Sequence, residues 1–174
     1  NRQLRGILAM NERTGEMFVA AEVVRLGMGS AESTFIVNVG SADGVAKGSP
    51  VITPSGLLGL VLEVSEHTAM AIDWSHSQFR TSAMTANGST YGIVEAHSGR
   101  FREEDVLRLV GAPFQTNINP GVRVVTSGRG DLYPRGILIG TIIGIDEADT
   151  GWRKSYLVRP AVRPEEARHV LVVK

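Results

Sequence analysis

The chain's four histidines are the side chains best suited to moving protons near neutral pH or to holding a metal ion. They stand at positions 67, 76, 97 and 169 of the 174 residues. No two have the short spacing that would place both imidazole rings on one metal ion, and the chain has no cysteine to complete a site. We therefore expect no metal site, and interpret His67 and His97 as solvated residues at strand ends.

His67, Asp73 and Ser127 occur in the chain order of the triad in chymotrypsin-like serine proteases. In those enzymes the serine lies in a Gly-Asp-Ser-Gly turn whose amides stabilise the oxyanion, whereas residues 125–128 here are Val-Thr-Ser-Gly. The short spacing from His67 to Asp73 is also wrong for residues that come from well-separated strands and loops. We predict no enzymatic activity, while a β-barrel hydrolase with an unrecognised site stays open as an alternative.

Glycine-rich loops bind phosphate when they lead into the N-terminus of a helix. Residues 127–131 (Ser-Gly-Arg-Gly-Asp) lead into another strand-like segment, so we predict no cofactor. Aromatic residues make up only 6% of the chain, few for a surface that stacks on sugars. A carbohydrate-binding module is a second alternative, and it would need Trp74 and Trp152 exposed on one face.

The charge balance excludes one large class of partners. The chain has 18 Lys plus Arg and 18 Asp plus Glu, a formal net charge of zero. Without a strong positive field, nucleic acid is not an expected partner. A chain of 174 residues with 43% hydrophobic residues is long enough for one domain of ordinary size or two small ones.

Short runs rich in Val, Ile and Leu, separated by Gly, Pro, Ser or Asp, follow one another from residue 17 onward. This pattern is typical of an all-β sandwich or barrel. We expect a first group of strands at 17–24, 34–39, 51–53, 57–64 and 69–74, and a second at 79–85, 90–95, 106–110, 123–126, 137–145 and 156–162. A last strand at 169–173 would return to the first group, which would give each group six strands.

An internal repeat favours two small barrels over one sandwich. Residues 48–53 and a following strand with Gly59 resemble residues 121–126 and a following strand with Gly140. Because glycine weakens a strand, its repetition predicts a bulge, a sharp corner or a close approach of two backbones. The expected domains are a helical end, a first barrel and a second barrel, at residues 1–16, 17–75 plus 168–174, and 76–167.

Three features indicate how the chain could associate. Leu4, Ile7 and Leu8 share one helical face, and an isolated helix this short is marginal, so we interpret them as the end of a coiled coil that dimerises. Phe101, an aromatic ring in a charged segment, is a candidate partner contact. Exposed edge strands would offer association by strand addition.

Three motifs occur in a specific order and spacing. They are Asp43-Gly44-Val-x-x-Gly48 followed by Gly56 and Gly59, then Thr126-Ser127-Gly128, and then Pro134-x-Gly136-Ile-x-Ile-Gly140. Together they extend across most of the chain and resemble the MreC family of bacterial rod shape-determining proteins. The resemblance implies that these residues make the fold and do not form a binding site.

The resemblance implies two β-barrel-like domains with chymotrypsin-like topology and no catalytic residues, preceded by the end of an α-helical coiled coil. It implies a periplasmic protein anchored in the inner membrane by an N-terminal span that lies outside this chain. The implied role is a non-enzymatic scaffold of the cell-wall elongation machinery that maintains rod shape. The implied partners are a second copy in a dimer or filament, a class B penicillin-binding transpeptidase, RodA, MreD and an MreB-linked complex.

Overall fold

The predicted strands form in the structure, a computed structural model that describes residues 5–6, 18–24, 33–97, 106–113, 117–129, 134–146 and 153–174. All pairs of strands are antiparallel. The elements in chain order are β1 (Phe18–Val24), β2 (Thr34–Val37), the 3-10 helix η2 (Ser41–Asp43), β3 (Pro50–Thr53), β4 (Gly56–Val64), β5 (Ala69–Asp73), β6 (Arg80–Thr85), β7 (Tyr91–His97), β8 (Val106–Pro113), β9 (Arg123–Thr126), β10 (Leu138–Ile145), β11 (Arg153–Pro160), the 3-10 helix η4 (Pro164–Glu166) and β12 (His169–Val173).

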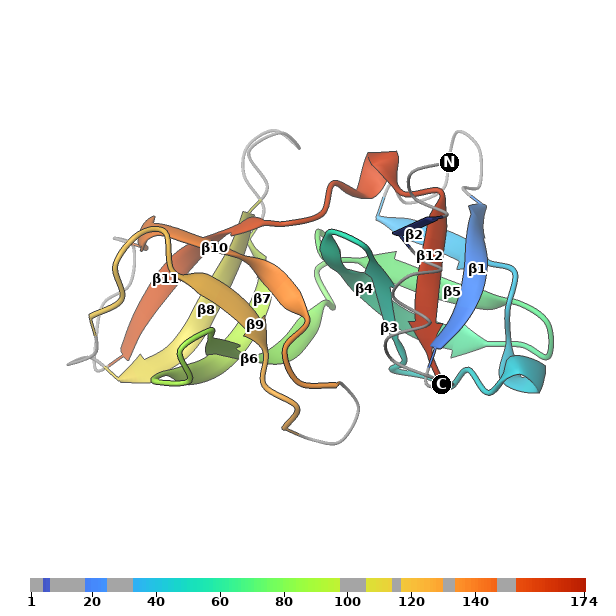
Figure 1. Ribbon diagram of the computed structural model, residues 1–174, viewed down its shortest axis with the longest axis horizontal. Coiled ribbons are helices and arrows are strands. Elements are labelled where there is room, and N and C mark those ends of the chain that lie inside the picture. The colour runs from blue at the N-terminus through green and yellow to red at the C-terminus, as the bar shows by residue number, and fades with distance from the viewer. Residues whose placement is uncertain are drawn as a thin grey trace. The chain divides into compact units, whose positions relative to one another are not determined.

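The strands close into two six-stranded barrels, which confirms the predicted all-β fold (Figure 1). Around the first barrel the order is β12-β1-β2-β5-β4-β3, and around the second it is β6-β7-β8-β11-β10-β9. If β12 is counted as the first strand of its barrel, the order of neighbouring strands around the first barrel is the same as that around the second. The first barrel is therefore a circular permutation of the second, because its leading strand comes from the C-terminal residues.

The chain returns to the first barrel earlier than predicted. Contacts divide it into one unit of residues 1–73 with 162–174 and another of 74–161, whereas the return was expected only at residue 168. Val162 and Ala167 are 4% and 5% exposed and belong to the core of the first barrel. The proline and acidic residues between them are typical of a linker, which is why the sequence pattern did not reveal the two buried anchors.

Each barrel has its own core, filled from alternate strand positions. Phe35 and Leu58 are fully buried in the first barrel, and Val170 and Val172 of β12 join the same cluster. Phe79, Leu109 and Tyr156 are fully buried in the second barrel. The hydroxyl of Tyr156 accepts a hydrogen bond from the amide of Ile118 at 3.4 Å, so this polar group is satisfied within the core.

The two glycines of the internal repeat face a neighbouring backbone at very short range. An added Cβ would lie 1.8 Å from the carbonyl oxygen of Ile72 at Gly59, and 2.1 Å from that of Arg159 at Gly140. Gly59 lies on β4 facing β5, and Gly140 lies at the equivalent place on β10 facing β11. The ladders of both β4 and β10 also shift register. The repeat therefore marks the point in each barrel where two backbones approach too closely for a side chain.

Closure of the barrels removes one predicted mode of association. Every described strand has a hydrogen-bonded neighbour on both sides within its own barrel. A closed sheet has no free edge to accept another strand. The hypothesis of strand addition at an exposed sheet edge is therefore wrong for the described strands.

Gly140 and Gly144 lie on the same strand and provide a matched test of the close approach. Gly140→Ala should lower the free energy of unfolding by about 1–3 kcal/mol, because the new Cβ forces the backbones of β10 and β11 apart. Gly144→Ala should be neutral or slightly stabilising, because nothing lies within 4 Å of its added Cβ. Urea denaturation of both variants measures the difference. Equal losses of stability would contradict this account.

Candidate functional site

The three residues that occur in the chain order of a protease triad do not form one. His67 is 77% exposed between β4 and β5, and its Nε2 lies 3.8 Å from Oε1 of the equally exposed Glu66. Asp73 is fully buried at the far end of β5, so the length of that strand separates it from His67. Ser127 belongs to the other unit, where its hydroxyl accepts a hydrogen bond from the amide of Arg129 at 3.3 Å. We find no hydrolase site of this kind among the described residues.

The other histidines have local roles. Nδ1 of His76 accepts a hydrogen bond from the amide of Gln78 at 3.0 Å, within the turn that precedes β6. His97 ends β7 and His169 begins β12. Within the described ranges, no group of three or more His, Asp or Glu residues is arranged to hold a metal ion.

The aromatic residues give no support to a sugar-stacking surface. Trp74 is only 8% exposed, so its ring is not available on the surface. Trp152 lies outside the described residues. The carbohydrate-binding alternative required both rings on one exposed face, and it is not favoured because Trp74 is buried.

The predicted association residues lie outside the described part of the chain. These are Leu4, Ile7 and Leu8 of the dimerisation helix, and Phe101. Arg5 and Gly6, which are described, have helical backbone. No described helix is long and apolar enough to cross a membrane.

The first signature motif builds a tight loop after β2. The amide of Gly40 donates to Oδ2 of Asp43 at 3.0 Å, and Gly44 ends η2 in the left-handed region at φ 89°. This loop inserts Val45, 3% exposed, into the core of the first barrel. The amide of Gly48 then donates to the carbonyl oxygen of Val61 at 2.8 Å. The carboxylate of Asp43 thus holds a backbone turn and is already occupied.

The remaining signature residues close the hairpins that lead into β4 and β10. Thr126 donates through its hydroxyl to the carbonyl oxygen of Pro134 at 2.6 Å and accepts from the amide of Ile137 at 2.9 Å. Thr53 has the equivalent place before β4, where its hydroxyl donates to the carbonyl oxygen of Gly56 at 3.4 Å. Turns at Gly128 and Gly136 adopt positive φ. The described contacts of these residues shape loops.

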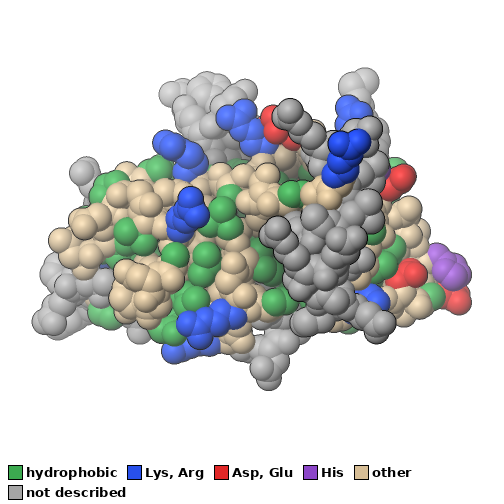
Figure 2. Space-filling model, viewed as in Figure 1, with side chains coloured by type: hydrophobic (Ala, Val, Ile, Leu, Met, Phe, Trp, Pro, Cys, Tyr) green, Lys and Arg blue, Asp and Glu red, His purple; other side chains and the backbone are tan. Residues whose placement is uncertain are grey.

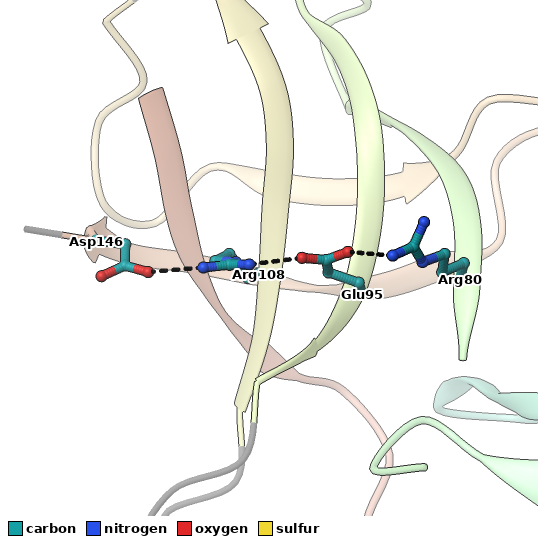
Figure 3. Close-up of polar contacts among 4 residues, drawn as sticks. All are labelled: Arg80, Glu95, Arg108 and Asp146. Carbon is teal, nitrogen blue, oxygen red and sulfur yellow. Dashed lines mark hydrogen bonds and ion pairs between the residues drawn. The ribbon is translucent and has the colours of Figure 1, made fainter. Parts of the chain in front are cut away.

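A row of four charged side chains crosses the outer wall of the second barrel (Figure 3). Nη2 of Arg108 lies 2.7 Å from Oε1 of Glu95, and Nη1 of Arg108 lies 3.5 Å from Oδ2 of Asp146. Arg80 extends the row, with its Nη2 3.4 Å from Oε2 of Glu95. Glu95 and Asp146 are the only carboxylates among the described residues of this unit, and both are held by Arg108.

Arg108 keeps its positive charge throughout the neutral pH range. The hydrogen bond to the Glu95 carboxylate raises the pKa of Arg108, more than its partial burial lowers it. A raised pKa contributes stability that is present below the unfolded-state pKa and is lost only as the pH rises through the folded-state value. For arginine both values lie far above neutral pH, so this contact does not make the fold sensitive to pH near 7.

Beside this row the barrel wall is hollowed into a groove of about 540 Å³. Its lining includes Ser82, Tyr91, Ile93, Arg108, Val110 and Arg129. The guanidinium carbon of Arg129 lies 3.9 Å from the centroid of the Tyr91 ring, within the range of a cation–π interaction. Ile93 is 44% exposed, which is unusual for a large apolar side chain on a barrel wall.

Sequence reasoning missed this groove, and only weak signals pointed to it. The apolar residues Ile93 and Val110 stand at outward positions of β7 and β8, next to the charged Glu95 and Arg108. Arg129 lies in a glycine-rich segment that the sequence indicated to be only a loop. On the face shown in Figure 2, hydrophobic side chains also lie among Lys and Arg side chains over the second barrel.

Comparison with known proteins gives one consistent result. A family model described as "Rod shape-determining protein MreC, barrel core" matches residues 23–174. The chain is 30% identical over 141 residues to the cell shape-determining protein MreC of Listeria monocytogenes, covering 79% of this chain and 47% of that protein. It is 30% identical over 147 residues to the protein of the same name from Caulobacter vibrioides, covering 84% and 41%. The chain thus spans about half the length of these relatives.

Solved structures agree in fold. The MreC structure from Listeria monocytogenes matches with a TM-score of 0.81 and 26% identity, covering 98% of this chain and 85% of that one. A major periplasmic domain "from the cell shape-determining filament MreC" matches with a TM-score of 0.75 and 22% identity, covering 90% and 98%. A complex between the penicillin-binding protein PBP2 and MreC from Helicobacter pylori matches with a TM-score of 0.68 and 16% identity, covering 90% and 99%.

The charged row can be tested by removing its central cation. Arg108→Met keeps the aliphatic stem but leaves Glu95 and Asp146, 17% and 9% exposed, without their shared partner. We expect a loss of about 2–3 kcal/mol in the free energy of unfolding, less than for a fully buried pair. Arg80→Met should cost less than about 1 kcal/mol, because the Arg80 side chain is 71% exposed. Thermal denaturation compares the two variants, and similar losses would show that the row is not held by Arg108.

Proposed function

The chain belongs to the MreC family of rod shape-determining proteins, and from this premise we propose that it is a non-enzymatic scaffold of the cell-wall elongation machinery. The observation that carries the proposal is the family match across both barrels. We further propose that the protein works in the periplasm, anchored in the inner membrane by a segment outside this chain. Its surfaces would bring cell-wall synthases together where the rod elongates.

The distribution of polar groups supports a scaffold over an enzyme. The signature residues are used in turns and backbone contacts, as at Asp43 and Thr126. The described carboxylates of the second barrel are held in ion pairs with Arg108. A catalytic site instead needs a nucleophile or base directed at a position that substrate can reach.

We propose a class B penicillin-binding transpeptidase as the principal partner. The solved complex of PBP2 with a Helicobacter pylori protein of the same fold supports this choice. RodA, MreD and an MreB-linked complex are proposed as further members of the assembly. The solved structures described as parts of a filament support self-association of this chain as well.

The proposed mechanism is a shift of conformational populations. A scaffold activates a synthase only if it binds the active conformation more tightly than the inactive one. If the two affinities differ tenfold, binding shifts the ratio of active to inactive enzyme by about tenfold. A protein without catalytic groups can therefore still control the rate of wall synthesis.

Binding to the transpeptidase can be tested directly. Sedimentation of this chain with the soluble periplasmic part of the transpeptidase from the same bacterium should show a complex heavier than either component. Phe101→Ala should weaken the complex if that ring is a partner contact. His67→Ala is the control, because His67 is highly exposed on the other barrel. Absence of a complex at high micromolar concentration would remove the main support for the partner.

Dimerisation should depend on the N-terminal helix. A form extended by the upstream sequence is expected to sediment as a dimer, because its apolar stripe must be buried against a second helix. Replacing Leu4, Ile7 and Leu8 together by Ser should shift that form toward the monomer. If the extended form is monomeric before any replacement, the helix is not a dimerisation element.

A further inference from the structure

The groove of the second barrel lies where the pairing of β7 with β8 ends. Ile93 and Val110 are the last residues that these two strands pair. Beyond them, Tyr91 and Gly92 pair only with β6, while β8 continues beside β11 through a bulge at Gly111. Residues of β6, β7 and β8 around this point line the groove, together with Arg129 and Ser155. Because pairing and register determine this opening, it is built into the fold.

Two glycines line the groove. Gly92 brings β7 against β8, since an added Cβ there would lie 2.5 Å from the carbonyl oxygen of Val110. Gly111 adopts a φ of 88° and has no atom within 4 Å of an added Cβ, so it faces open space at the bulge. Neither residue places a side chain over the apolar surface of Tyr91, Ile93 and Val110.

The charged side chains that line the groove are Arg108 and Arg129. Glu95 and Asp146, the carboxylates described in this unit, are both turned to Arg108, so the row beside the groove is neutral as a whole. Arg129 is exposed at the groove and contacts the Tyr91 ring, with no described carboxylate beside it. Among the described residues at the groove, no carboxylate balances the positive charge of Arg129, which lies next to an exposed apolar surface.

We propose that this groove is the docking site for an extended, acidic segment of a partner protein. An apolar side chain of that segment packs on Ile93 and Val110, and a neighbouring carboxylate pairs with Arg129. Charge complementarity and the exposed Ile93 carry the proposal. It is independent of the proposed transpeptidase complex, because it concerns one extended acidic segment, whose binding is measured with a peptide alone.

A peptide fits this groove better than a sugar does. Sugars stack on the open face of an aromatic ring, but the guanidinium of Arg129 already covers one face of Tyr91. An extended peptide presents neighbouring apolar and acidic side chains, and the groove is lined by both apolar residues and a cation. The hydroxyl of Ser82 adds a polar group along the same wall.

The test uses the 174-residue chain and a fluorescein-labelled peptide of alternating Glu and Val. Anisotropy measures affinity, and amide chemical shifts of the labelled protein locate the site on β7 and β8. Arg129→Glu should weaken binding by about tenfold, since a charge-assisted contact is lost. Arg159→Glu is the matched control, because Arg159 is also exposed but lies outside the groove. The same peptide with Lys in place of Glu should not bind.

A second matched pair tests the apolar contact. Ile93→Ser should weaken peptide binding severalfold, whereas Ile145→Ser should leave it unchanged, although Ile93 and Ile145 are 44% and 45% exposed. Equal effects of the two arginine variants would overturn the proposal, since binding would then reflect overall charge. Chemical-shift changes on peptide binding that are confined to strands other than β7 and β8 would also overturn the proposal. If phosphatidylglycerol vesicles or inorganic phosphate bind at Arg129 and the peptide does not, the groove is a lipid or free-anion site, and the proposal of a peptide site is overturned.

Discussion

Closing a six-stranded sheet into a narrow barrel forces some strand backbones into direct contact, and this constraint organises both halves of the molecule. Gly59 and Gly140 allow the contact at equivalent positions, each against a carbonyl oxygen of the next strand. Register shifts in the same strands accompany it. These two contacts determine the paths of the strands. The strands in turn position the cores, the outer walls and the hairpins at Thr53 and Thr126.

The residues that reveal the family are therefore not the residues that face a partner. Turn and contact residues such as Gly44, Gly59 and Thr126 have few substitutes, because they meet a backbone requirement. Positions on the outer wall are less constrained, since a barrel tolerates many different side chains there. This is why a sequence of this kind identifies its family clearly while it leaves the binding surface open.

Strand positions could be predicted because apolar alternation and glycine or proline punctuation act locally. The two-barrel division also followed, since the repeat around Gly59 and Gly140 is visible in the sequence. The return at Val162 could not be predicted, because burial of a single residue in a linker depends on the packing of distant strands. The groove at Ile93 was missed for the same reason, since it lies where the pairing of β7 with β8 ends, and the sequence pattern does not show that point.

The permuted first barrel has a consequence for the order in which the protein folds as it is made. All six strands of the second barrel lie between residues 80 and 160, so that barrel can close as soon as this stretch is synthesised. The first barrel begins the chain but needs β12 at residues 169–173. Domains usually fold in the order of their synthesis. Here the barrel that emerges first is completed last, and its apolar interior must wait for the final strand.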